Sequence, residues 1–199
     1  AIVDVTTGAV VNNDYHALTT ELALGFKDFI SPDAPDIYPE ELRADIDALN
    51  VIIYADFNLA VNLAALVTNQ KDYEYYYDRI FARLDWLEER LSKQRYLMGD
   101  TITDSDIRIF PTLARFDLVF YQKYLVNKKR LVDYPNLWNY AKDLYSNPAF
   151  GGTTDFDSMR KRFYYVDHTP FEDLPRLVPK GPDDSIWLEP NDRAEKFGK

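Results

Sequence analysis

Residues 104–124 form the stretch that most restricts how this chain can fold. Apolar side chains would cover nearly the whole circumference of a helix here, and the largest include Phe110, Phe116 and Phe120. A helix that is apolar almost all round has to be surrounded by other helices, so this stretch predicts the centre of a helical bundle. Pro111 lies inside it and predicts a kink or an unpaired carbonyl.

The start of this predicted helix carries three aspartates close together, Asp100, Asp104 and Asp106. Thr103 and Asp106 have the spacing of a capping box, in which the threonine hydroxyl and the aspartate carboxylate each accept a backbone N–H of the other. A metal site is the alternative, but the EF-hand spacing with its glycine and distal glutamate is absent. We therefore interpret these carboxylates as capping and solvated groups, and we expect no metal.

Two long amphipathic helices are predicted ahead of the apolar one. Apolar side chains recur at spacings of three and four over residues 40–67 and again over residues 71–93. Each stripe has to be buried, so the two helices should pack antiparallel. Shorter helices are predicted at residues 136–146 and 155–165. The fold class is therefore all-α.

The predicted elements divide the chain into four parts: residues 1–30, a linker at 31–39 with three prolines, an all-helical domain at 40–165, and an extended tail at 166–199. The first part contains two short β segments, followed by a helix that Asn13 or Asp14 caps and that ends near Gly25. Two strands and one helix cannot bury a core. We interpret this part as the end of a larger domain.

Composition argues against several functional classes. The formal charge is −10, with short basic stretches only, which is unlike a nucleic-acid-binding protein. There is no cysteine, and the two histidines, His16 and His168, lie far apart, so neither a thiolate nor a histidine-based metal site is expected. No apolar run approaches the roughly 18 residues of a membrane span, and no signal peptide is recognisable, so we expect a cytoplasmic protein.

A few polar or aromatic residues stay open to two interpretations. Arg108, Arg115 and Asp117 interrupt the apolar helix, and pairing with neighbours is expected because an unpaired buried charge is costly. A ligand contact by either arginine is the alternative. The tyrosines at 73–77 and 164–165 favour packing, with an aromatic substrate pocket as the alternative.

Several sequence blocks resemble one known family. The order of parts and the box at Thr103 and Asp106 are similar to the glutathione S-transferase superfamily. Finer matches resemble its Xi class, the glutathionyl-hydroquinone reductases, and they include "YPEELRADIDALN", "LDWLEERLSKQRYLMGDTITDSDIR", "DYPNLWNYAKDLY" and "LVPKGP". The resemblance implies a glutathione transferase C-terminal-type helical bundle, preceded by a β-hairpin and helix that are the remnant of a thioredoxin-like domain.

The resemblance also implies a chemistry. In the family, the thioredoxin-like domain binds glutathione and supplies a cysteine, whose thiolate attacks the sulfur of a glutathionyl adduct. The helical domain supplies the pocket for a quinone-type aromatic substrate. Because the family's cysteine motif would lie upstream of Ala1, we expect this chain alone to be inactive. A homodimer that meets through the helical domains is also implied.

Residue roles follow from the family's motifs. The family's Asn-Asn-Glu-Ser contacts the γ-glutamyl group of glutathione, which implies that role for Asn13 and Asp14, although Tyr15 replaces the serine. The substrate pocket would be lined by Tyr164, which keeps a family tyrosine, by Phe120 and Asn62, which stand where the family has tyrosines, and by Arg115.

Two functions are therefore carried forward. The first is a Xi-like enzyme of glutathione-dependent thiol transfer, with glutathione as cosubstrate, of which this chain is the substrate-side part. The second is a non-catalytic transferase-like module for dimerisation or partner binding, which the two missing pocket hydroxyls at Asn62 and Phe120 favour.

Overall fold

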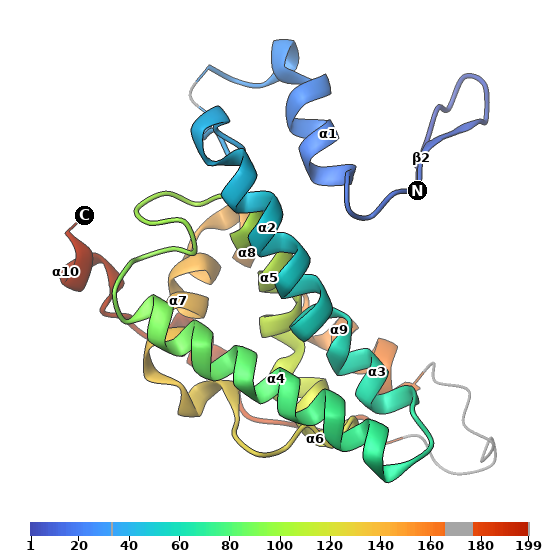
Figure 1. Cartoon of the computed structure of the whole chain (residues 1–199), viewed down its shortest axis with the longest axis vertical. Coiled ribbons are helices and arrows are strands. Elements are labelled where there is room, and N and C mark those ends of the chain that lie inside the picture. The colour runs from blue at the N-terminus through green and yellow to red at the C-terminus, as the bar shows by residue number, and fades with distance from the viewer. Residues whose placement is uncertain (33, 166–176, 199) are drawn as a thin grey trace.

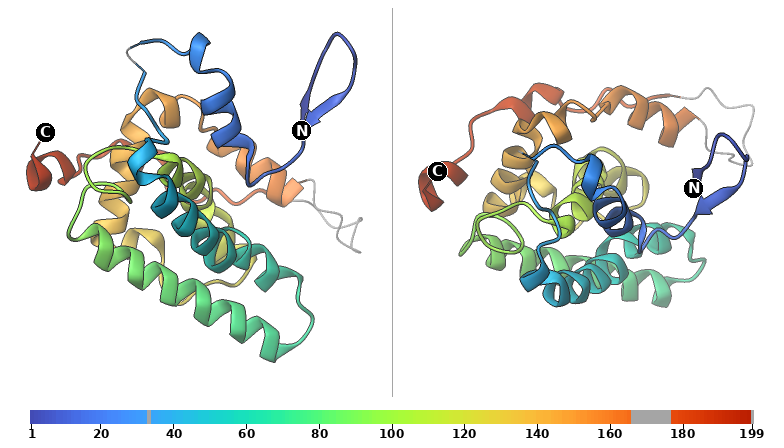
Figure 2. Two further views of the ribbon diagram at one scale, coloured as in Figure 1. Left: turned by 45° about the horizontal axis from the view of Figure 1, so that its top comes forward. Right: turned by 90° about the horizontal axis from the view of Figure 1, so that it is seen from above.

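The computed structural model describes residues 1–32, 34–165 and 177–198. A helical bundle holds most of the chain, and a small N-terminal hairpin stands away from it (Figures 1 and 2). The bundle begins with an unbroken helical arm that runs beside the long helix α4 in the opposite direction. The arm comprises the 3-10 turn η2 (Glu40–Leu42), α2 (Arg43–Ile53), the π-helical turn η3 (Tyr54–Asn58) and α3 (Ala60–Leu66), and α4 spans Gln70–Leu91.

The arm differs from the expected single α-helix because of its π-helical turn. Polar Asn58 ends this turn, and its amide reaches across to α5 (Asp104–Arg115). There the Asn58 Nδ2 donates to the Arg108 carbonyl at 3.0 Å, and its Oδ1 accepts from the Thr112 hydroxyl at 2.8 Å. Asn58 therefore hydrogen-bonds α5 on both sides of Pro111, and the helix continues past the proline.

The arm Glu40–Leu66 is long and apolar enough to cross a membrane, judged by length and composition alone, since an 18-residue stretch within it has a mean hydropathy of 1.5. The expectation that no segment would reach this length is therefore wrong. Within the described structure, its side chains Leu49, Ile53 and Phe57 are buried in the same core as α4 and α5. Core helices pass the same test, so the finding carries no membrane assignment.

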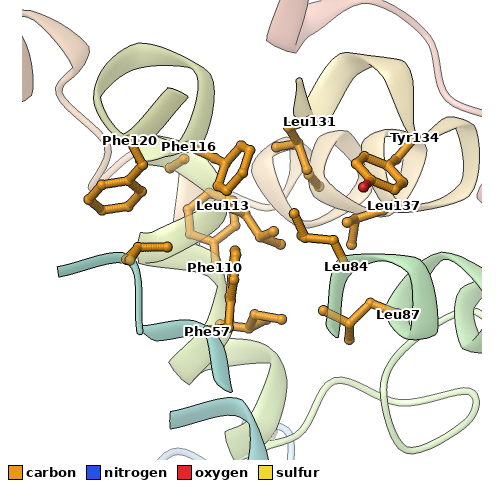
Figure 3. Packing of buried hydrophobic residues seen from close by; sticks show 14 of the residues in the cluster. Phe57, Leu84, Leu87, Phe110, Leu113, Phe116, Phe120, Leu131, Tyr134 and Leu137 are labelled. Carbon is orange, nitrogen blue, oxygen red and sulfur yellow. The ribbon is translucent and has the colours of Figure 1, made fainter. Parts of the chain in front are cut away.

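The apolar helix forms the centre of the bundle, as its composition predicts. It runs from α5 through a π-helical turn, η4 (Phe116–Phe120), into the short α6 (Tyr121–Lys123). The rings of Phe57 and Phe116 pack with centroids 5.9 Å apart, which joins the arm to the central helix. Figure 3 shows these rings among leucines of α4 and of the following helices.

Thr103 and Asp106 form the capping box at the start of α5. The Thr103 N–H donates to Asp106 Oδ2 at 2.8 Å, and the threonine hydroxyl donates to the same oxygen at 3.0 Å. Asp106 Oδ1 accepts from the Leu97 N–H at 3.0 Å and from the Tyr140 hydroxyl at 2.6 Å. Asp104 and Asp106 are fully buried, so the expectation that they are solvated is wrong. Burial raises the pKa of Asp106, and its hydrogen bonds oppose that rise.

Asp117 is paired with backbone rather than with an arginine. Its carboxylate accepts from the N–H groups of Leu131 at 2.5 Å and Val132 at 3.2 Å, and so caps the 3-10 turn η5 (Leu131–Asp133). Burial raises the pKa of this carboxyl, and the two backbone donors lower it less. A pairing of Asp117 was expected, but no helical spacing could have predicted that its partners are the backbone N–H groups of Leu131 and Val132.

Asp117 predicts a pH dependence of stability. A carboxyl whose pKa is raised on folding stabilises the folded state at acid pH. This contribution is lost as the pH rises from 3.8, the ordinary pKa of the carboxyl, through its higher pKa in the folded state. We expect the chain to lose stability over that window relative to Asp117→Asn, which does not titrate. Urea unfolding between pH 4 and 7 measures the difference. Parallel stability curves for the two proteins would contradict the assignment.

The N-terminal residues form an antiparallel pair, β1 (Ile2–Val3) and β2 (Val10–Asn12), then α1 (Leu18–Gly25) and the 3-10 turn η1 (Lys27–Phe29). The predicted cap of α1 is wrong, because the helix starts later and Ala17 takes that position without a side-chain hydrogen bond. Asp14 instead accepts from the His16 N–H at 2.8 Å in a local turn.

The described residues after η5 contain the helices α7 (Pro135–Ser146), α8 (Pro148–Gly151), α9 (Phe156–Tyr165) and, near the end of the chain, α10 (Arg193–Phe197). The expected extended tail therefore contains helix in its described part, including the 3-10 turn η6 (Asp184–Leu188). Arg193 explains why α10 docks, since it is fully buried and donates to the carbonyls of Leu91 at 2.7 Å and Arg95 at 2.6 Å. Residues 166–176 of that expected tail, including His168, lie outside the described residues.

Candidate functional site

Arg108 joins the N-terminal segment to the central helix. Its Nε donates to the buried carboxylate of Asp104 at 2.5 Å. Its other nitrogens donate to the carbonyls of Tyr15 at 3.2 Å and His16 at 2.6 Å, and to the Thr19 hydroxyl at 2.7 Å. The planar fork of a guanidinium can hold several acceptors at once, so one side chain fixes where residues 15–19 lie on the bundle.

Asn13 and Asp14 lie just ahead of this joint. Both are exposed, and the Asp14 backbone carbonyl accepts from the Leu18 N–H at 3.0 Å, which positions the turn that enters α1. The Asp14 N–H donates to Asn12 Oδ1 at 2.7 Å. The two residues with the expected glutathione role are thus placed on an ordered turn, which Arg108 anchors one residue further along.

A cluster of aromatic rings covers the same joint, and sequence reasoning did not find it. The His16 ring meets the Tyr54 ring edge-on at 4.4 Å, and the Tyr15 and Tyr54 centroids lie 5.5 Å apart. The Arg108 guanidinium lies over the Tyr15 ring at 5.8 Å. Tyr54 lies in the π-helical turn of the arm, far from His16 in sequence, so no spacing rule could have paired them.

Phe120 and Tyr164 are brought to one wall, where η4 meets α9. The Phe120 ring packs against Tyr124 at 5.4 Å and Phe163 at 6.2 Å. The Tyr164 hydroxyl donates to the Leu118 carbonyl at 3.2 Å, a long bond that another acceptor could replace. Burial raises the pKa of Tyr164, so its hydroxyl stays protonated as a donor.

Arg115 borders this wall, whereas Asn62 is held elsewhere. Arg115 and Phe163 line one groove of about 260 Å³, and the Arg115 guanidinium donates to its own helix at the Pro111 carbonyl, 2.6 Å away. Among the described residues it has no carboxylate partner, contrary to the expected pairing, and burial lowers its pKa. Asn62 Nδ2 donates to the Asn58 carbonyl at 2.9 Å. No hydrogen bond or ring contact in the described structure joins Asn62 to the other three predicted pocket residues.

In the described part of the chain, no group of three or more His, Cys, Asp or Glu side chains is placed to hold a metal ion. The polar groups of the site are instead hydrogen-bond donors and aromatic rings. Such an arrangement suits a flat organic ligand with a few polar atoms.

The helical bundle, its capped central helix and its site of hydrogen-bond donors and aromatic rings define a helical domain of the glutathione transferase type. Residues 70–143 match the family described as glutathione S-transferase, C-terminal domain. The chain is 35% identical over 173 residues to the glutathionyl-hydroquinone reductase PcpF of Sphingobium chlorophenolicum, an alignment that covers 87% of this chain and 54% of that protein.

Solved structures agree with the sequence comparison. The Xi glutathione transferase of Phanerochaete chrysosporium superposes with a TM-score of 0.84 at 36% identity, covering 90% of this chain and 58% of that one. The glutathione-bound YqjG of Escherichia coli K-12 gives a TM-score of 0.88 at 31% identity, covering 98% and 62%. The chain carries a glutathione S-transferase C-terminal domain over residues 70–143, and the proteins it is similar to include Xi-class glutathione transferases and glutathionyl-hydroquinone reductases. It spans about half the length of the curated relatives it matches.

Proposed function

We propose that the protein to which this chain belongs is a Xi-type, glutathione-dependent thiol transferase that reduces glutathionyl-(hydro)quinone-type aromatic substrates. The observation that carries the proposal is the similarity to glutathionyl-hydroquinone reductases, which extends over almost the whole of the described bundle. The non-catalytic alternative is not favoured, since the relatives with this similarity are named as enzymes.

Within this proposal, the chain supplies the substrate side of the site. Asn13 and Asp14 would contact the γ-glutamyl end of glutathione on the turn that Arg108 anchors. Tyr164 would offer the one remaining pocket hydroxyl to an oxygen of the aromatic ring, beside the Phe120 ring. Arg115, a half-buried cation without a carboxylate partner in the described structure, would favour a substrate oxygen that carries negative charge.

The nucleophile has to come from outside these residues, because the chain has no cysteine. A cysteine thiolate would attack the sulfur of the glutathionyl adduct, forming a protein–glutathione disulfide while the carbon–sulfur bond breaks and the aromatic ring takes up a proton. The thiolate of a second glutathione would then attack this mixed disulfide, which gives glutathione disulfide and frees the cysteine thiolate. Residues 1–30 would be the end of the domain that carries this cysteine, and residues 40–165 the helical domain. We further propose that the protein is a homodimer. We also propose that it is cytoplasmic, because the reaction needs reduced glutathione.

Tyr164→Phe tests the proposed pocket in the proposed enzyme, in which this chain acts together with the cysteine-bearing domain. We expect kcat/KM for a glutathionyl-hydroquinone to fall about tenfold, because the lost hydrogen bond leaves a substrate oxygen unpaired. The 199-residue chain alone should show no turnover.

Tyr38→Phe is the matched control for this experiment. Its hydroxyl donates to the Asp47 carboxylate at 2.9 Å, and no hydrogen bond or ring contact in the described structure joins it to a proposed pocket residue. Equal losses of activity in the two variants would refute the pocket assignment. Turnover by the chain alone would refute the proposed external cysteine.

A further inference from the structure

A partly open cavity of about 200 Å³ lies between the central helix and segments that follow it in the chain. One wall comes from α5 and η4, and the opposite wall from α9, η5 and the segment that contains η6. None of the predicted site residues lines it. Its apolar lining includes Leu113, Leu118, Leu131, Trp138, Phe156 and Trp187.

We propose that this cavity binds a small, uncharged aromatic molecule of one ring, such as a simple phenol. The proposal does not depend on the thiol chemistry above, because no proposed substrate contact is shared with that site.

The size and the lining of the cavity favour an aromatic ring. An apolar cavity of about 150 Å³ is large enough to stay dry and to bind benzene. Part of the lining here is an aromatic cluster, in which Trp187 packs edge-on against Trp138 at 4.7 Å and is tilted against Phe156 at 5.4 Å. Aromatic walls of this kind contact a ring by its face and by its edge, which a flexible aliphatic chain would not use as well.

The charged groups around the cavity favour a neutral ligand. The Arg160 guanidinium pairs with the Asp184 carboxylate, with one bond from Nη1 at 2.8 Å and a second from Nη2. Arg130 pairs with Asp133 at 2.7 Å. The Asp117 carboxylate already accepts two backbone N–H groups. An ion entering the cavity would lose its hydration and find every counter-charge already occupied.

Binding can be measured with 4-fluorophenol and the full chain by fluorine NMR. We expect saturable binding, and tryptophan emission should change with the same midpoint, since Trp138 and Trp187 line the cavity. Ala114→Leu, which extends a cavity-lining side chain of α5, should weaken binding at least about tenfold. Ala65→Leu, on the exposed surface of α3, should leave the affinity unchanged.

4-Fluorobenzoate is the matched charged probe, and it should bind at least about tenfold more weakly than the phenol. Absence of saturable phenol binding, equal affinity in Ala114→Leu, or tighter binding of the benzoate would each overturn the proposal. Circular dichroism checks that Ala114→Leu folds. If it does not, the tryptophan titration of the unaltered chain decides, because a midpoint unrelated to the NMR curve would place the ligand elsewhere.

Discussion

Asp106→Ala is expected to lower the free energy of unfolding by about 4 kcal/mol, a large part of the stability of a domain of this size. The carboxylate accepts from four groups that the substitution would strand: the backbone N–H groups of Thr103 and Leu97 and the hydroxyls of Thr103 and Tyr140. Each buried donor left unpaired costs about 1–3 kcal/mol. The loss is therefore expected to exceed the roughly 1 kcal/mol of an ordinary helix cap.

Urea unfolding followed by circular dichroism measures this loss, and the same stretch provides its control. Asp100 is exposed, so Asp100→Ala should change the free energy of unfolding by less than about 0.5 kcal/mol. Tyr140→Phe should fall between the two, because it removes one of the bonds to the carboxylate. If Asp106→Ala behaved like Asp100→Ala, Asp106 would be a surface cap and not the centre of a buried network.

The contrast between these two aspartates shows what a sequence can predict here. The box of Thr103 and Asp106 is local, because its partners lie three residues apart, and the structure contains it. The partners that bury Asp106 are not local, since Tyr140 arrives on α7 from 34 positions away. Spacing therefore identified the cap but assigned the wrong environment to the carboxylate.

The helices show the same difference between local patterns, which the sequence predicts, and contacts between distant residues, which it does not. The stripes of α4 and the apolar composition of α5 predicted both helices closely, because burial there follows a period of 3.6 residues. The π-helical turn at Tyr54–Asn58 and the docking of α10 were not predictable, since they depend on Asn58 meeting Arg108 and on Arg193 meeting the end of α4. In the candidate site, family motifs supplied the residue roles, whereas the joint at Arg108 came from the fold alone.

Arg108→Met is expected to have the second large effect, and it should be concentrated at the N-terminal segment. The Asp104 carboxylate would keep only the Asn50 amide, 2.8 Å away, since its Oδ1 has no hydrogen-bond partner in the described structure. A buried charge that loses its ionic partner typically costs about 3–5 kcal/mol. The carbonyls of Tyr15 and His16 would also lose their donor, so amides in residues 15–25 should exchange with deuterium at least about tenfold faster.

Arg115→Met separates the joint from a general effect of removing an arginine from this helix. Arg115 donates only to the Pro111 carbonyl of its own helix among described partners, so we expect a loss below about 1 kcal/mol and unchanged exchange at residues 15–25. Adding Asp104→Asn to Arg108→Met should restore part of the stability, because the stranded charge is removed, but it should not restore slow exchange, because the donors to the N-terminal carbonyls remain absent. Recovery of both together would mean that the segment depends on the stability of α5 and not on the fork of Arg108.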